Sequence, residues 1–250
     1  TDGNGRYQFT NLLPGNYQVQ FTLPNGYVWT ISNTGGDGLD MDGTFTDNTD
    51  ETSITDVVEL TGPVVDSDTS ASVKHVTDPT IDAGVIPVLS LGDLVWLDSN
   101  LDGQFDNSET PIADVTVTLL DGSGNPATDA QGNPVAPTTT DSDGRYEFDN
   151  LLPGDYQVEF TLPTGYVWTV SNTGGDGLDS DAVFTANTDA TATTDVFTLS
   201  PTPVVDSDTN PAAREVTNPT IDAGVAPIVY DLALVKVLPA GQRYKKLDPI

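Results

Sequence analysis

The sequence contains no cysteine and a single histidine, His75, and these absences exclude several classes of chemistry. Without cysteine there is no disulfide, no thiolate nucleophile and no sulfur-ligated metal site. The chain repeats itself, as described below, and the repeat places Glu215 where the first copy has His75. Serine residues therefore lack a consistent histidine partner for a catalytic triad. We predict that the chain is not an enzyme.

Basic residues are also scarce, with 8 Lys and Arg against 38 Asp and Glu, for a formal net charge of -30. Such a surface repels nucleic acid and anionic membranes, so neither is an expected partner. No apolar run approaches the roughly 20 residues of a membrane span, so no membrane insertion is expected in this segment. The charge also opposes compaction. Disorder is one answer, but Trp, Tyr, Phe and Val recur at strand-like spacing, which favours bound cations as the neutralising agent.

Turn-forming residues make up much of the remaining sequence, including 23 Gly and 18 Pro with many Thr, Asn and Asp. These residues suit turns and loops and are poor in helix interiors. The composition therefore predicts an all-β fold.

The chain is internally repeated with a period of about 140 residues, a domain-sized unit. Residues 1–30 return at 140–169, and S-N-T-G-G-D-G-L-D returns from Ser32 at Ser171. We predict that residues 1–86 are the C-terminal part of one module, that 87–226 form a complete module and that 227–250 begin a different domain. Proline restricts the backbone, so the seams Ile86-Pro87 and Ala226-Pro227 are expected to be stiff linkers.

The complete module shows about seven short segments with strand patterns, a number that suits a two-sheet sandwich. In Asp155–Leu162, Tyr156, Val158 and Phe160 share one face of the expected strand. This segment and Arg145–Phe148 are expected to form a hairpin through Leu-Leu-Pro-Gly. The insert at 122–134 is expected to be a long hairpin loop, either decorative or a contact surface. The remaining predicted strands are Leu91–Leu97, Val115–Leu120, Tyr166–Val170, Asp195–Leu199 and Thr220–Val225.

The most specific motif is D-S-N-L-D-G-Q-F-D-N-S-E at Asp98–Glu109, which fits the calcium-loop pattern D-x-[DN]-x-[DN]-G-x5-E. Such loops supply side-chain oxygens at positions one, three and five, a backbone carbonyl at seven, a water-mediated contact at nine and a bidentate Glu at twelve. Strand patterns rather than helices flank it, so we expect a fixed structural Ca²⁺ instead of a sensor. The alternative is a solvated acidic turn. The predicted ligands are Asp98, Asn100, Asp102, Gln104, Asp106 and Glu109.

Further acidic residues are closely spaced elsewhere in the chain. Crowded carboxylates repel each other unless a cation lies between them, and the alternative is that many simply form turns. We expect at least one further ion. The candidate ligands are Asp93, Asp141, Asp143, Asp176, Asp179, Asp181, Asp206, Asp208 and Asp222, and the first module repeats the pattern at Asp37, Asp40, Asp42, Asp66 and Asp68.

Three segments, G-D-L-V-W-L-D-S-N-L-D-G, T-D-S-D-G-R-Y-E-F-D-N-L-L-P-G-D-Y-Q-V-E-F and N-P-T-I-D-A-G-V, resemble the B-type domains of serine–aspartate repeat surface proteins. The middle segment is also similar to the wider collagen-adhesin B-type and transthyretin-like sandwiches. The resemblance implies tandem Greek-key β-sandwiches, immunoglobulin-like or transthyretin-like, that hold several calcium ions. It implies an extracellular stalk whose partners are neighbouring repeats, and it carries the calcium loop onto Asp98, Asn100, Asp102, Asp106 and Glu109.

Many collagen-adhesin relatives are instead locked by a Lys–Asn isopeptide bond. Residues 87–226 contain no lysine, so this bond cannot form within the complete module. The tail Y-D-L-A-L-V-K-V resembles the opening strand of another surface-repeat domain, in which Lys236 is a candidate isopeptide lysine.

We therefore predict a calcium-stiffened spacer of a large secreted bacterial surface adhesin or extracellular appendage. One alternative is a calcium-dependent carbohydrate-binding module in which Trp29 and Trp168 stack on sugars, although core packing explains these residues equally well. Another is a polymerising fibre subunit, possible because residues 1–86 lack a counterpart of the Leu91–Leu97 strand and its calcium loop. In that case a neighbouring copy in the fibre would supply the strand.

Overall fold

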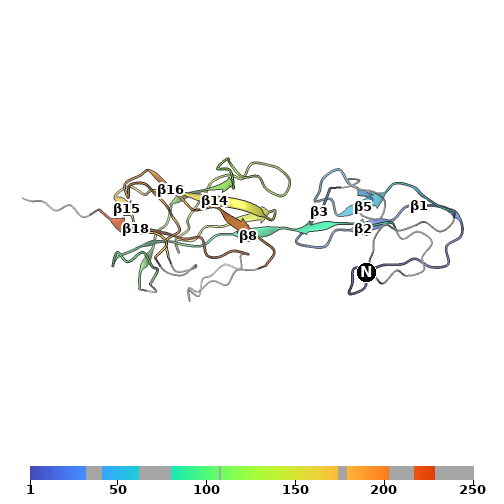
Figure 1. The fold of residues 1–250 in the computed structure, drawn as a ribbon, viewed down its shortest axis with the longest axis horizontal. Helices are drawn as coiled ribbons and strands as arrows, with labels where there is room; N and C mark the ends of the chain where they lie inside the picture. Colours follow the sequence, from blue (N-terminus) through green and yellow to red (C-terminus); the bar gives the residue numbers. More distant parts are fainter. Residues whose placement is uncertain (32–40, 62–79, 107, 174–178, 203–216, 229–250) are drawn as a thin grey trace, which may run out of the picture.

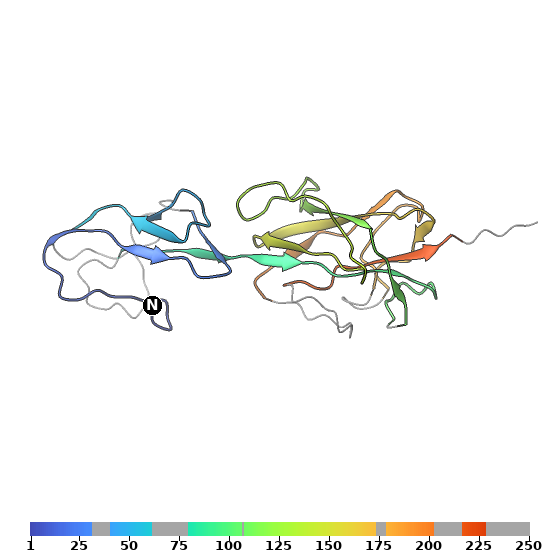
Figure 2. The same ribbon diagram turned by 180° about the vertical axis from the view of Figure 1, so that it is seen from behind.

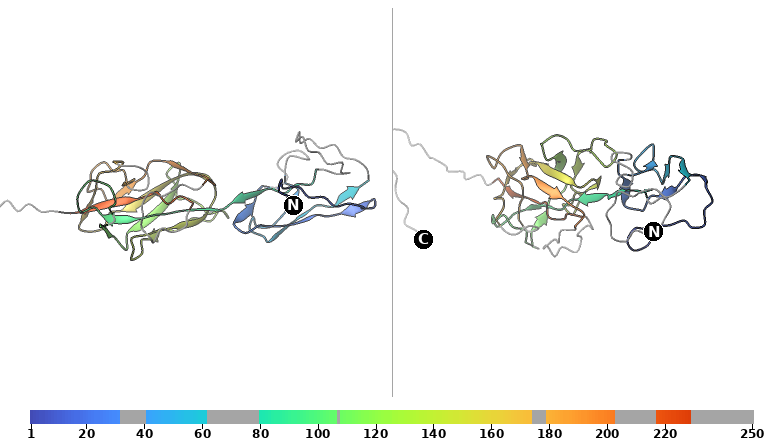
Figure 3. Two further views of the ribbon diagram at one scale, coloured as in Figure 1. Left: turned by 90° about the horizontal axis from the view of Figure 1, so that it is seen from below. Right: turned by 45° about the vertical axis from the view of Figure 1, so that its right-hand side comes forward.

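The computed structural model describes residues 1–31, 41–61, 80–106, 108–173, 179–202 and 217–228. All regular secondary structure in these residues is β-strand. Two bodies lie end to end, and one extended segment of chain runs between them (Figures 1 and 3). The part of the chain described here contains no helix long and apolar enough to cross a membrane.

The second module is a two-sheet sandwich. One sheet has the order β10-β9-β18-β15, and the other has the order β12-β11-β14-β16, with β17 also pairing with β14. Strands β8 and β13 form a further antiparallel pair. Bounds are β8 Leu89–Leu91, β9 Val95–Leu97, β10 Thr110–Pro111, β11 Thr116–Asp121, β12 Thr138–Thr139, β13 Phe148–Leu151, β14 Gly154–Thr161, β15 Tyr166–Trp168, β16 Thr191–Thr193, β17 Phe197–Leu199 and β18 Ala223–Pro227.

The core of this module lies between the sheets and comes from alternating strand residues. On β14, Tyr156, Val158 and Phe160 are buried, while the residues between them are partly or fully exposed. They join Val117 and Leu119 of β11 in the core cluster. Tyr146 and Phe160 pack edge to face, with ring centroids 5.6 Å apart. The predicted all-β sandwich is confirmed.

The first module repeats part of this arrangement with the same registers. Its strands are β1 Gly15–Tyr17, β2 Gln20–Thr22, β3 Tyr27–Trp29, β4 Gly43–Thr44, β5 Thr52–Thr55, β6 Val58–Leu60 and β7 Val85–Pro87. Trp29 pairs with Val85 in β3 and β7, as Trp168 pairs with Val225 in β15 and β18. In the second module β18 also pairs with β9 in parallel. The described part of residues 1–85 contains no counterpart of β9 or β11.

Two predicted features of the strands were wrong. The expected hairpin does not form, because β13 pairs with β8 whereas β14 pairs with β11, β16 and β17. Leu-Leu-Pro-Gly therefore connects β13 and β14, two strands that pair with different partners. The expected single strand at 91–97 is divided into β8 and β9 at Gly92, where an added Cβ would lie 2.2 Å from the Tyr146 carbonyl oxygen. Strands β10, β12 and β16 are too short to give a pattern and were not predicted.

Candidate functional site

The acidic loop Asp98–Glu109 joins β9 to β10, which pair antiparallel and bring its two ends together. Asp98 follows β9 directly and is fully buried. Its Oδ1 accepts a 2.6 Å hydrogen bond from the Leu101 amide, and its Oδ2 accepts one of 2.8 Å from the Gly103 amide and one from the Thr169 hydroxyl. The first position of the motif is therefore a buried carboxylate fixed by neutral donors.

Glu109, the last position of the motif, closes the loop across its base. Its Oε1 accepts hydrogen bonds from the Ser99 amide at 2.7 Å and the Ser99 hydroxyl at 3.2 Å. Its Oε2 accepts from the Asp106 amide at 3.2 Å. Since Glu109 is itself buried, this carboxylate ties the beginning of the loop to its end.

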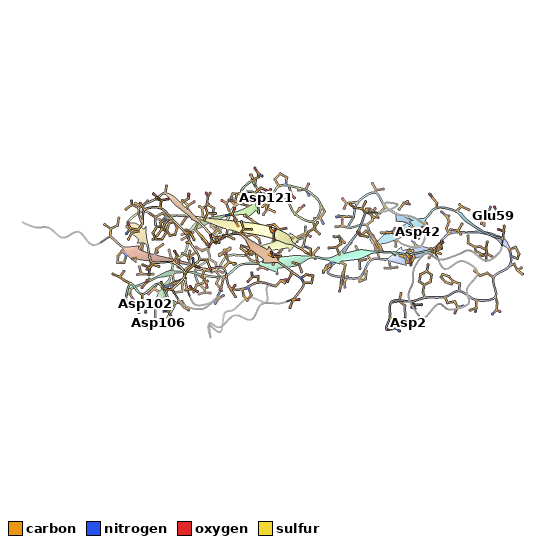
Figure 4. The ribbon with its side chains drawn as sticks, viewed as in Figure 1. Asp2, Asp42, Glu59, Asp102, Asp106 and Asp121 are labelled. Carbon is orange, nitrogen blue, oxygen red and sulfur yellow. The ribbon has the colours of Figure 1, made fainter. Side chains whose placement is uncertain are left out.

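The exposed positions of the motif also converge. The Asn100 side-chain amide donates to Asp102 Oδ2 at 2.9 Å and to Asp106 Oδ2 at 3.2 Å. Asp102 and Asp106 project from the end of the second module that lies away from the first (Figure 4). The amide nitrogen thus lies between two carboxylates that would otherwise repel each other.

Thr173 and Ser180 hold the loop by hydrogen bonds to its backbone. The Thr173 hydroxyl donates to the Asp102 carbonyl at 3.0 Å, and the Ser180 amide donates to the Gly103 carbonyl at 3.1 Å. Gln104 forms an isolated antiparallel bridge with Asp179, which is buried. Gly103 has φ +77°, and an added Cβ would lie 2.4 Å from the Val170 carbonyl oxygen. Glycine is therefore required here by both conformation and space.

The donor set of the loop suits a hard cation such as Ca²⁺, because every predicted ligand offers oxygen. Among the described residues, however, no three or more histidine, cysteine, aspartate or glutamate side chains are grouped so that they could hold a metal ion. The structure brings Asp98, Asn100, Asp102, Asp106 and Glu109 together through hydrogen bonds. Calcium binding by these residues stays a prediction.

A second acidic group lies in the second module, where Asp93 and Asp222 are buried and Asp181 is partly buried. Asp93 Oδ1 lies 3.3 Å from Arg145 Nη1, and both side chains are almost fully buried. Asp222 Oδ1 accepts a 3.1 Å hydrogen bond from the Leu94 amide, and Asp181 Oδ2 accepts one of 2.8 Å from the Asp222 amide. The fold thus brings together three predicted ligands that are distant in sequence.

Tyr146 lies close to these carboxylates, which affect the pKa of its phenol. Its hydroxyl donates a 2.6 Å hydrogen bond to the Ile221 carbonyl. Burial raises the pKa of Tyr146 well above its ordinary value, and the carboxylates of Asp222, Asp93 and Asp181 raise it further. The phenol is therefore held in its neutral form.

The described part of the first module repeats two of these hydrogen bonds. The Asp82 amide donates to Asp42 Oδ2 at 2.6 Å, and the Tyr7 hydroxyl donates to the Ile81 carbonyl at 2.6 Å. Arg145 and Tyr146 were not among the predicted site residues. The one sequence signal for them is the dipeptide Arg-Tyr, which occurs at equivalent positions of both repeats.

Other predicted ligands lie elsewhere. Asp141 Oδ1 accepts hydrogen bonds of 2.9 Å from the amides of Asp143 and Arg145, so Asp141 shapes a turn, and Asp143 is exposed on it. This geometry matches the alternative interpretation of these two residues as turn formers. Predicted positions that lie outside the described residues are Asp37, Asp40, Asp66, Asp68, His75, Asp176, Asp206, Asp208, Glu215 and Lys236.

Trp29 and Trp168 are core residues with 3% and 2% of their surface exposed. Their indole nitrogens donate to the carbonyls of Asp50 and Asp189 at 2.8 and 2.9 Å. Neither ring offers an open face to a sugar, so the structure favours the core-packing interpretation of these residues.

The chain is similar to known proteins over most of its length. The SdrD B-like domain family matches residues 1–85 and 89–228. Serine-aspartate repeat-containing protein E of Staphylococcus aureus (strain USA300) is 40% identical over 202 residues, which are 80% of this chain but 15% of that protein. Serine-aspartate repeat-containing protein F of Staphylococcus epidermidis (strain ATCC 12228 / FDA PCI 1200) is 39% identical over 188 residues, 74% of this chain and 10% of the relative.

Two solved structures also match, at low identity. The minor pilin GBS52 of Streptococcus agalactiae has a TM-score of 0.32 and 15% identity, covering 67% of this chain and 60% of the pilin. The group B streptococcus pilus 2b backbone protein has a TM-score of 0.33 and 12% identity, covering 88% of each chain. The matched residues 1–85 and 89–228 include both copies of the repeat, and on this evidence the chain belongs to the SdrD B-like domain family.

Proposed function

We propose that the chain is a structural spacer in which calcium stiffens the modules and the seams between them, with no catalytic role. Membership of the family gives it an extracellular location, at the cell surface or in an appendage. The observation that carries the proposal is the continuity of the chain between modules. β7 ends at Pro87, β8 begins at Leu89, and Val88 alone lies between them.

This seam leaves little room for independent motion. β7 pairs with β3 of the first module, and β8 pairs with β13 of the second. The Val88 amide itself donates a 2.9 Å hydrogen bond to the Gly26 carbonyl. Flexible linkers are long and rich in Gly and Ser, whereas this connection is extended and hydrogen-bonded on both sides. Such a seam suits a rod that transmits force from one module to the next.

Calcium would bind at the end of the second module that lies away from the β7–β8 seam (Figure 4). The residues that would hold it are Asp98, Asn100, Asp102, Asp106 and Glu109, together with the Gln104 carbonyl. The bound ion would neutralise part of the charge of -30, which opposes compaction. A ligand at a hundredfold its dissociation constant stabilises the folded state by about 2.7 kcal/mol per site. We expect the loop to bind first, because in the second acidic group Asp93 already pairs with Arg145.

Differential scanning calorimetry of the full chain, with calcium and with excess chelator, tests this proposal. We expect calcium to raise the melting temperature of the wild type. The increase should be lost in an Asp102→Asn/Asp106→Asn variant, whose changes are confined to exposed loop side chains. Asp195→Asn, another exposed position outside both acidic groups, is the matched control and should keep the increase. A melting temperature of the wild type that is the same with calcium and with chelator would refute calcium stiffening.

A further inference from the structure

The loop between β11 and β12 is well ordered by hydrogen bonds, and the proposed spacer function gives it no role. We call residues 121–135 the junction loop. It contains two copies of a D-x-x-G-N turn, beginning at Asp121 and Asp129. In each, the Asp carboxylate accepts hydrogen bonds from the amides two and four residues later, at 2.8 to 2.9 Å. Asn125 and Asn133 close the turns.

The junction loop is anchored to its own module at several points. The Ala127 amide donates to the Leu119 carbonyl of β11 at 3.1 Å, and within the loop the Val135 amide donates to the Ala127 carbonyl at 2.9 Å. At the second turn, the Ala130 amide donates to the Asn150 carbonyl at 2.8 Å, and the Asn150 side-chain amide donates to Gln131 Oε1. Contacts within the second module therefore fix the conformation of the junction loop, independently of a partner.

The second turn of this loop contacts the first module. The Asn48 side-chain amide donates a hydrogen bond to the Ala130 carbonyl across 82 residues of sequence. Asn48 lies in the turn between β4 and β5. In Figures 1 and 2 the junction loop extends from the second module beside the seam, on the side that faces the first module. The contact thus lies beside the β7–β8 connection and is separate from it.

The internal repeat supplies a natural comparison for Asn48. Asn187 occupies the same place in the second module, since its carbonyl accepts from the Trp168 amide at 2.8 Å as that of Asn48 accepts from the Trp29 amide at 2.8 Å. Asn48 is half-buried, whereas Asn187 is exposed. The local turn is the same in both modules, and the half-buried Asn48 differs in its contact with the junction loop of the second module.

Two further polar atoms are buried at this contact. Asn48 Oδ1 and Gln131 Nε2 are both inaccessible to solvent and have no hydrogen-bond partner among the described residues. One is an acceptor and the other a donor, on the two sides of the junction. Buried polar groups are unfavourable unless they pair, so both atoms add to the polar character of this contact.

We propose that the junction loop of each repeat docks on the Asn48-type turn of the repeat before it, which fixes the angle and twist between successive modules without metal. Asn187 would present the same docking turn to any further repeat that carries such a loop. The partner it fits is a loop with the D-x-x-G-N turn of residues 129–133. The proposal rests on the spacer function but involves no calcium, so the two can fail separately.

Distance measurements between spin labels test this docking, and the absence of cysteine makes labelling simple. Cysteines at Glu59 and Thr161, exposed strand positions in the first and second modules, receive the labels, and the full chain is measured in chelator. We expect a narrow distance distribution. Asn48→Asp removes the donor at constant shape and should broaden the distribution about twofold, because the seam alone would then restrain one module against the other.

The matched control is Asn187→Asp, which removes the same donor and adds the same charge at constant shape in the equivalent turn. It should leave the distribution unchanged, and Asn48→Ala should repeat the broadening if Asn48→Asp folds poorly. Unchanged width in both Asn48 variants, with both modules folded by calorimetry, would overturn the proposal and leave the β7–β8 seam as the source of stiffness. Equal broadening by Asn187→Asp would also overturn it, because the effect would then arise within the turn.

Discussion

The backbone amide of Asp98 donates a 2.8 Å hydrogen bond to the carbonyl oxygen of Val225. This bond joins the first residue of the acidic loop to β18, the strand by which the chain leaves the second module. β9 and β18 run parallel immediately before it, with Leu97 opposite Val225. A change in the conformation of the loop therefore acts directly on β18, the last described strand of the second module.

The buried carboxylate of Asp98 should contribute to stability even without calcium. Asp98→Ala leaves the amides of Leu101 and Gly103 and the hydroxyl of Thr169 without their acceptor. Each lost buried partner costs about 1 kcal/mol or more, so we expect a loss of about 3 kcal/mol in chelator. Urea unfolding measures it. The exposed Asp102→Asn should cost less than about 0.5 kcal/mol under the same conditions. Equal losses would contradict a structural role for Asp98.

Gly103 should tolerate no side chain. Gly103→Ala combines a positive φ with a close approach to the Val170 carbonyl, so we expect a loss of about 2 kcal/mol or more in the unfolding free energy. Gly132→Ala is the matched control, because its φ of +81° is nearly the same but nothing lies within 4 Å of the added Cβ. It should lose only about 1 kcal/mol. Similar losses in urea unfolding would show that the packing of the loop on Val170 is unimportant.

Local patterns in the sequence predicted the features that are local in the structure. The alternation of Tyr156, Val158 and Phe160 predicted which face of β14 is buried. The acidic motif predicted a loop, and hydrogen bonds join the ends of this loop and its exposed side chains. The hairpin prediction failed because Leu-Leu-Pro-Gly satisfies local turn chemistry, whereas the pairing of β13 with β8 spans distant sequence. Pairing partners of short strands are not encoded in turn residues.

The same limit applies to the buried acidic group. Arg145 and Asp93 are 52 residues apart, and no spacing rule connects them. Tyr146 has the pattern of an ordinary core aromatic, and its contact with the Ile221 carbonyl appears only when β18 is in place. Likewise, the contact of Asn48 with Ala130 depends on how two modules meet. Sequence periodicity describes one module at a time, so it gives no information on that contact.

Arg145 should be essential for holding Asp93 in the core. Arg145→Met removes the cation and leaves a carboxylate in a buried site, and breaking a buried pair in this way costs about 3–5 kcal/mol. The double variant Asp93→Leu/Arg145→Met removes both charges and should recover much of that loss, since replacing a buried pair by apolar residues is often nearly neutral. Chemical denaturation of the two single variants and the double variant measures the coupling. Additive losses would show that the two side chains do not interact.

Tyr146 should make the protein sensitive to alkaline pH. The folded-state pKa of its phenol is raised, so the stabilising effect is complete below the unfolded value of 10.0 and is lost as the pH rises above it. Tyr146→Phe removes the hydrogen bond to the Ile221 carbonyl and should cost about 1 kcal/mol at pH 8. Because the variant has no proton to lose at this position, its disadvantage should shrink between pH 10 and 11 in urea unfolding. Tyr156→Phe should show the same trend more weakly, since burial alone raises the pKa of Tyr156. A Tyr146→Phe disadvantage that stays constant across this range would contradict a raised pKa for the buried phenol of Tyr146.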